Sequence, residues 1–141
     1  MKSHERSLES TASPEKVWRI WSDTSTWPQW NPDVTAISLD GPFASGSSGS
    51  MTTKAGGTHR IELRDVEPGR AFTLVTSPAP LGTFAFRCQV MPAGAGTRIS
   101  QGVGMSGPLG GLYSAMMGNR IAEGFVAILD GLKQRAESHE A

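Results

Sequence analysis

Three polar residues share a face of a strand-like segment with apolar residues: Arg6, His59 and Gln101. His59, for example, alternates with Ile61 and Leu63, which is the period-two pattern of a half-buried strand. In a closed core each polar group needs a partner, because an unpaired buried group costs about 1–3 kcal/mol. In a ligand cavity the same groups would orient a carbonyl or a hydroxyl. For Arg6 and His59, a strand end in solvent explains the residue equally well.

The C-terminal part of the chain offers a second set of candidates. Apolar residues recur there at spacings of three and four, which predicts a long amphipathic helix from about Gly107 to Ser138. Methionines give a plastic apolar surface that suits irregular ligands, although they more often fill a core. Arg120 either extends its guanidinium to solvent or contacts an anionic ligand. The candidate ligand-binding residues on this helix are Tyr113, Met116, Met117, Arg120 and Ile121.

Apolar side chains on the middle strands would form the opposite wall. The alternation predicts that one face of each strand points toward the long helix, with arginines and Glu62 on the other face. These wall candidates are Ile61, Phe72, Leu74, Phe84 and Phe86. Trp30 lies between two prolines, and we expect it at the mouth of the cavity.

Other kinds of chemistry find little support in the sequence. Its three histidines and one cysteine have no metal-ligand spacing, so neither a metal nor another cofactor is expected. Cys88 shares a face with Phe86 and Val90, which favours an inert buried thiol. The acidic residues are spread along polar faces and do not form the carboxylate pair that general acid–base catalysis would suggest. No catalytic residue can therefore be named.

Composition narrows the class of protein. The 141 residues suit one domain, 1–141, with a real core, and the net charge is zero. The sequence has no basic excess for nucleic acid, no apolar run long enough to span a membrane, and a polar N-terminus without signal-peptide character. A single cysteine excludes an internal disulfide. We therefore expect a cytoplasmic protein with no nucleic-acid partner, whose oligomeric state the sequence leaves open.

The predicted elements follow a simple order. A first strand within residues 3–11 precedes short helices within 14–29, and six further strand segments precede the long helix. Those segments are 34–39, 50–54, 59–66, 71–76, 83–91 and 97–105. One-sided alternation predicts an α+β fold, in which the helix covers the concave face of a curved antiparallel sheet.

The short helices carry the most specific motif of the chain. Ser13 is a suitable N-cap and Pro14 suits the first helical position. The motif comprises Ala12-Ser13-Pro14-Glu15-Lys16-Val17-Trp18, then Trp21-Ser22-Asp23 and Trp27-Pro28-Gln29-Trp30-Asn31-Pro32. It resembles the opening of the START-like (SRPBCC) superfamily, in particular its polyketide cyclase/dehydrase-type members. The resemblance implies a helix-grip fold of six or seven strands, with a cavity between the sheet and the long helix.

The resemblance also implies a function. It favours binding of a small hydrophobic or aromatic molecule, lipid-like or polyketide-like, in that cavity. The alternative is a polyketide cyclase/dehydrase-type enzyme that acts on a ligand held in the same place, and a third class would act through protein partners. The glycine-rich segment from Gly102 to Gly111 is either a permissive turn or a gate to the cavity.

Overall fold

The computed structural model describes residues 4–54, 57–76, 83–106 and 110–138; of residues 110–119 it describes the backbone. Within these ranges seven strands form one antiparallel sheet in the order β1-β7-β6-β5-β4-β3-β2. The strands are β1 Glu5–Ser10, β2 Val34–Leu39, β3 Ser48–Thr53, β4 Gly57–Glu67, β5 Ala71–Thr76, β6 Thr83–Ala93 and β7 Gly96–Ser106. The helices are α1 Pro14–Trp21, a 3-10 turn η1 Thr24–Thr26, α2 Trp27–Trp30 and α3 Gly110–Ser138. This is the predicted helix-grip fold.

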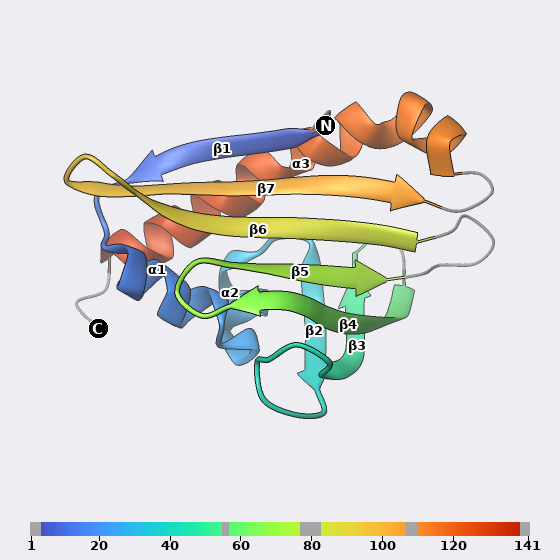
Figure 1. Cartoon of the computed structure of the whole chain (residues 1–141), viewed down its shortest axis with the longest axis horizontal. Coiled ribbons are helices and arrows are strands. Elements are labelled where there is room, and N and C mark those ends of the chain that lie inside the picture. Colours follow the sequence, from blue (N-terminus) through green and yellow to red (C-terminus); the bar gives the residue numbers. More distant parts are fainter. Residues whose placement is uncertain (1–3, 55–56, 77–82, 107–109, 139–141) are drawn as a thin grey trace.

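The long helix and the short helices lie on the same side of the curved sheet (Figure 1). α3 runs along the sheet and ends beside α1, close to the turn between β6 and β7. The core lies between these helices and the inner face of the sheet, and Val17, Leu63, Ile99 and Leu132 are fully buried there.

The short helices begin where the sequence predicts. The Ser13 hydroxyl accepts a hydrogen bond from the Lys16 amide at 3.2 Å, and Pro14 occupies the first turn of α1. Asp23 caps η1 through the Ser25 amide at 3.2 Å. α1 buries Val17 and Trp21. Capping and amphipathicity thus fix both the start and the buried face of α1.

The register of the central strands places alternate residues on the inner face. Phe72 of β5 pairs with Cys88 of β6, which pairs with Gln101 of β7. Arg60 and Arg64 are exposed on the outer face, as the alternation predicts. β5 differs from the predicted pattern. All six of its residues are buried, because β5 lies at the centre of the sheet.

Two glycine-rich segments are more regular than the sequence suggests. Gly49 lies within β3, where the carbonyl of Ser38 leaves no room for a Cβ atom. Residues 102–106 belong to β7 and pair with β6 up to Ser106, so that part of the expected turn or gate is strand. The rest of the proposed gate lies partly in 107–109, outside the described residues, and its last two residues begin α3.

Candidate functional site

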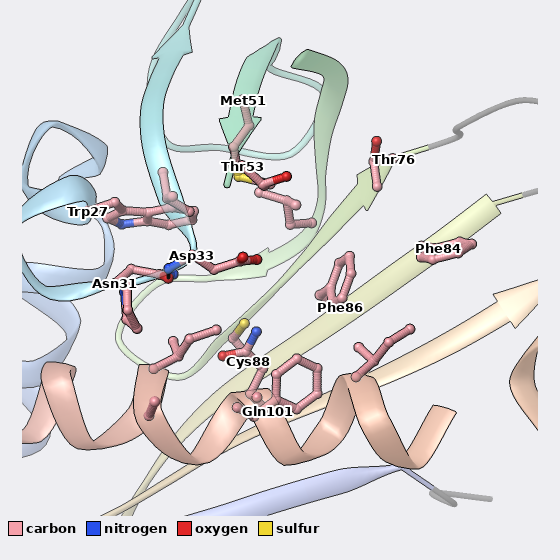
Figure 2. Close-up of a pocket in the computed structure, with 18 of the residues that line it drawn as sticks. Trp27, Asn31, Asp33, Met51, Thr53, Thr76, Phe84, Phe86, Cys88 and Gln101 are labelled. Atoms are coloured by element: carbon pink, nitrogen blue, oxygen red, sulfur yellow. Dashed lines mark hydrogen bonds between the residues drawn. The ribbon is translucent and has the colours of Figure 1, made fainter. Parts of the chain in front are cut away.

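A cavity of about 660 Å³ lies between α3 and the inner face of the sheet. Side chains of β5, β6 and β7 form one wall, α3 forms another, and the segment 31–34 together with β3 forms a third (Figure 2). This volume falls within the range of small-molecule binding sites. The predicted position of the cavity, between sheet and long helix, is therefore correct.

Phenylalanines dominate one side of the cavity. Phe84 and Phe86 project from β6 with ring centroids 6.4 Å apart, and both are visible in Figure 2. Phe86 packs edge-on against Phe125 of α3, with centroids 6.1 Å apart and an interplanar angle of 79°. Such edge-to-face pairs stabilise the fold by more than the burial of their apolar area alone provides. The aromatic wall is thus a built part of the fold.

Phe72 is the centre of a second aromatic group, which joins the short helices to the sheet. Its ring lies 5.4 Å from that of Trp21 and 6.3 Å from that of Trp27. The indole Nε1 of Trp27 donates a hydrogen bond to the Trp21 carbonyl at 3.0 Å. Phe72, Trp21 and Trp27 all line the cavity, so the contacts that dock the short helices also shape the site.

The interior of the cavity is mostly apolar, with few polar groups. Gln101 is 9% exposed and Thr76 is 8% exposed, and both line the cavity. Cys88 also lines it, and burial raises the pKa of its thiol far above the ordinary value, although the nearby charge of Arg87 lowers it. Cys88 is therefore a neutral thiol at physiological pH and a poor nucleophile.

The charged groups of the site lie at its rim. Asp33, Lys54 and Arg120 line the cavity and are exposed, and His59 is half-buried. The described residues include no group of three or more His, Cys, Asp or Glu side chains arranged to hold a metal ion. The described interior is therefore largely apolar, and the exposed charged groups lie at the rim.

Eight of the fourteen residues predicted to bind ligand line the cavity. They are His59, Phe72, Leu74, Phe84, Phe86, Gln101, Arg120 and Ile121. Three more candidates, Tyr113, Met116 and Met117, fall among the side chains outside the described residues, so their assignment stays a prediction.

The other three candidates lie elsewhere in the fold. Arg6 is on the edge strand β1, beyond β7, and its guanidinium donates to the Glu5 carbonyl at 2.9 Å. Ile61 faces inward as predicted, but core side chains cover it and leave 2% exposed. Trp30 is buried within the core, and its Nε1 donates to Thr26 Oγ1 at 3.0 Å. The expectation that Trp30 lies at the cavity mouth is wrong.

Several lining residues were missed by sequence reasoning. Thr76 follows Phe72 and Leu74 at the same period of two, so the alternation contained the signal for it. Phe125 and Ile128 were interpreted as ordinary core, and Cys88 as a structural thiol, yet all three line the cavity. The segment 31–34 and Met51 carried no periodic signal, because an irregular segment and a short strand reach the site through tertiary packing.

The sequence also matches a known protein family, and that family agrees with the fold and with the presence of a cavity. A family described as polyketide cyclase/dehydrase and lipid transport matches residues 1–137. The chain belongs to this family. No curated protein is similar enough in sequence to match it.

Solved structures share the fold at low sequence identity. XoxI from Bacillus cereus is 19% identical with a TM-score of 0.77, and the match covers 99% of this chain and 100% of that one. Ara h 8.0201 is 15% identical with a TM-score of 0.69, over 96% of this chain and 97% of that one. Norcoclaurine synthase from Thalictrum flavum, solved with dopamine and hydroxybenzaldehyde, is 14% identical with a TM-score of 0.70, over 97% of this chain and 87% of that one. The described part of the chain contains no helix long and apolar enough to cross a bilayer.

Proposed function

We propose that this member of the polyketide cyclase/dehydrase and lipid transport family binds a small hydrophobic or aromatic molecule in the cavity beneath α3. The observation that carries the proposal is the cavity itself, about 660 Å³ in volume and walled by Phe84, Phe86 and Phe125. Burial of a ligand's apolar surface there would provide roughly 25 cal/mol per Å² before the losses of binding entropy. The family description, which names lipid transport, supports the same class of ligand.

The likeness to norcoclaurine synthase supports aromatic molecules as a second class of candidate ligand. That enzyme was solved with dopamine and hydroxybenzaldehyde, both of which carry one ring. Edge-on rings such as Phe86 and Phe125 suit an aromatic guest, because ring quadrupoles favour edge-to-face contact.

An enzyme of the cyclase/dehydrase type is the alternative, and the family description favours it as a class. General acid–base catalysis needs a positioned proton donor or acceptor. Among the described residues that line the cavity, His59 is more suitable than Asp33, because His59 is half-buried and Asp33 is exposed, and it is more suitable than Cys88, because the pKa of the Cys88 thiol is strongly raised. If the protein is an enzyme, His59→Gln should abolish turnover of a bound ketone substrate and leave its affinity nearly unchanged.

The binding proposal is tested with an uncharged fluorescent reporter, N-phenyl-1-naphthylamine. We expect saturable binding with enhanced emission to the wild-type protein. Gly124→Phe adds a ring to the side of α3 that lines the cavity, where an added Cβ would meet no atom within 4 Å, so it should weaken binding at least tenfold. Val126→Phe is the matched control, because Val126 is exposed on the same helix and does not line the cavity.

Loss of reporter binding in both variants, or in neither, would contradict binding at this cavity. If the reporter binds as expected, the natural ligand is sought by native mass spectrometry of protein purified from its own host. A retained small molecule that Gly124→Phe protein lacks and Val126→Phe protein keeps would identify it.

A further inference from the structure

Two polar side chains of the cavity wall are buried without a hydrogen-bond partner. The Oε1 atom of Gln101 and the Oγ1 atom of Thr76 have almost no solvent exposure and make no hydrogen bond. Both residues are more than nine-tenths buried, and both line the cavity. Native proteins pair nearly all buried polar groups, so two unpaired groups on residues that line one cavity require an explanation. A bound molecule that pairs them, after rotation of the two side chains exposes these atoms to the cavity, would supply it.

The sheet register fixes how far apart these groups lie. Thr76 is opposite Phe84, and Gln101 is opposite Cys88, so the two positions are offset by four residues along β6. They also lie on different neighbours of β6, two strand spacings apart. At about 3.3 Å per residue and 4.8 Å per strand, their Cα atoms are on the order of 16 Å apart. Figure 2 accordingly shows Gln101 beside α3 and Thr76 toward the far end of β5.

Apolar groups fill the wall between the two polar positions. Phe86 lies between them in Figure 2, and Leu74 is its partner on β5. A ligand that reaches both polar groups must therefore be elongated and apolar in its middle. Gln101 Oε1 is an acceptor and needs a hydroxyl or N–H from the ligand, whereas the Thr76 hydroxyl can donate or accept.

The charges of the site limit the ligand further. Asp33, Lys54 and Arg120 are exposed at the rim and His59 is half-buried, and no described Asp, Glu, Lys or Arg lines the interior beside Gln101 and Thr76. An ionised ligand group at either polar position would lose its hydration without gaining an opposite charge, which is strongly unfavourable. The polar ends of the ligand should therefore be neutral.

We propose that the ligand is an elongated, uncharged molecule with an apolar body and a hydrogen-bonding group at each end, one paired with Gln101 and the other with Thr76. This inference rests on the proposed binding function and specifies the class of ligand. It distinguishes such a molecule from a fatty acid, whose single ionised end fits neither position, and from a purely apolar hydrocarbon.

The test uses three rigid probes with one shape: 4,4′-dihydroxystilbene, 4-hydroxy-4′-methylstilbene and 4,4′-dimethylstilbene, all trans. Their affinities are measured by displacement of N-phenyl-1-naphthylamine. Because a net hydrogen bond corresponds to roughly a three- to tenfold change in affinity, wild-type protein should bind the dihydroxy probe at least tenfold more tightly than the dimethyl probe. Gln101→Leu and Thr76→Val should each remove the advantage of one hydroxyl, and the double variant should reverse the order of the probes.

Gln89→Leu is the matched control, because Gln89 follows Cys88 on β6 and therefore points to the opposite face of the sheet. It should leave the order of the probes unchanged. The comparison of probes on wild-type protein stands even if a variant fails to fold.

Equal or tighter binding of the dimethyl probe by wild-type protein would overturn the inference and leave the binding function intact, with ordered water as the partner of both groups. Failure of all three probes to displace a bound reporter would also overturn it. Absence of reporter binding would overturn the binding function itself.

Discussion

Gly131 of α3 lies directly against the backbone carbonyl of Trp30, so closely that a Cβ atom at position 131 would overlap the Trp30 oxygen. The contact joins the C-terminal half of α3 to the end of α2. Nearby, the Arg135 guanidinium donates to Gln29 Oε1 at 2.6 Å. Two elements about a hundred residues apart in sequence are thereby held in one fixed arrangement.

Gly131→Ala should therefore destabilise the protein, although alanine is the better helix former. Overpacking of this kind costs about 1–3 kcal/mol, and here the obstacle is backbone that cannot rotate away. Gly124→Ala is the control on the same helix, because an added Cβ there meets nothing within 4 Å. It should stabilise by up to about 1 kcal/mol through helix propensity. Urea denaturation measures both changes, and equal midpoints for the two variants would show that α3 can shift away from Trp30.

Trp21 should contribute more to stability than Trp18, although both belong to α1. Trp21 is 2% exposed, whereas Trp18 is only partly buried. We expect Trp21→Ala to cost about 3–5 kcal/mol. Trp18→Ala removes edge contacts with Phe43 and Phe72 and should cost clearly less. Denaturation midpoints compare them, and a larger loss for Trp18→Ala would contradict the packing described.

Gln101→Leu should leave the free protein as stable as wild type or raise its free energy of unfolding by about 1 kcal/mol. The reason is that the substitution removes a buried carbonyl oxygen without a partner, and such a group is unfavourable in a folded protein. Thermal unfolding without ligand measures the change. A loss of more than about 1 kcal/mol would mean that Gln101 supports the fold and is not held for a ligand.

The Cys88 thiol should react slowly with Ellman's reagent in the native protein at pH 8. It is 3% exposed, and burial raises its pKa, so thiolate is scarce. Since each pKa unit lowers the thiolate fraction tenfold, we expect native protein to react at least tenfold more slowly than unfolded protein. The double variant Cys88→Ser/Ser7→Cys moves the single cysteine to an exposed position of β1 and should react quickly. Rapid modification of native Cys88 would indicate frequent opening of the cavity.

Glu137 should make stability depend on pH. The hydrogen bond from the Ser10 hydroxyl at 2.7 Å lowers the pKa of this carboxyl, and the Thr11 amide at 3.0 Å lowers it further. A lowered folded-state pKa means that the stabilisation is present above the ordinary glutamate pKa of about 4.3 and is lost as the pH falls through the folded value.

Glu137→Gln should accordingly cost about 1 kcal/mol at pH 7, a modest value because solvent screens the carboxylate. The difference from wild type should shrink as the pH is lowered below about 4. Glu123→Gln, an exposed glutamate on the same helix, controls for loss of charge alone. A difference that grows toward acid pH would contradict the assigned role of Glu137.

Most strands of this fold could be predicted from the sequence, because turn residues and alternation are local signals. The bounds predicted for β2 and β5 agree with the structure, and those of β6 and β7 differ by one or two residues at their ends. The glycines of 102–104 resemble turn residues, yet β6 supplies their hydrogen-bond partners, which a local pattern does not contain.

Only about half of the site could be predicted from the sequence, because a local pattern does not contain tertiary contacts. Period-two alternation identified the strand wall, including Phe86 and Gln101. It could not decide between Trp27 and Trp30, which lie on one short helix and differ only in which partner each meets. Both side chains are buried, but of the two only Trp27 lines the cavity, and the Trp30 carbonyl packs against Gly131 of α3, which is far away in sequence.

The attachment of α3 at residues 131–137 also separates two tasks along a single helix. Gly131, Arg135 and Glu137 hold it to the rest of the fold, whereas the described residues that line the cavity lie between 120 and 128. Substitutions at the exposed lining positions Arg120, Gly124 and Ala127 can reshape the cavity while the attachment stays intact. Phe125 and Ile128 line the same cavity but belong to the core, so the segment that an engineer can vary with little loss of stability is its exposed side.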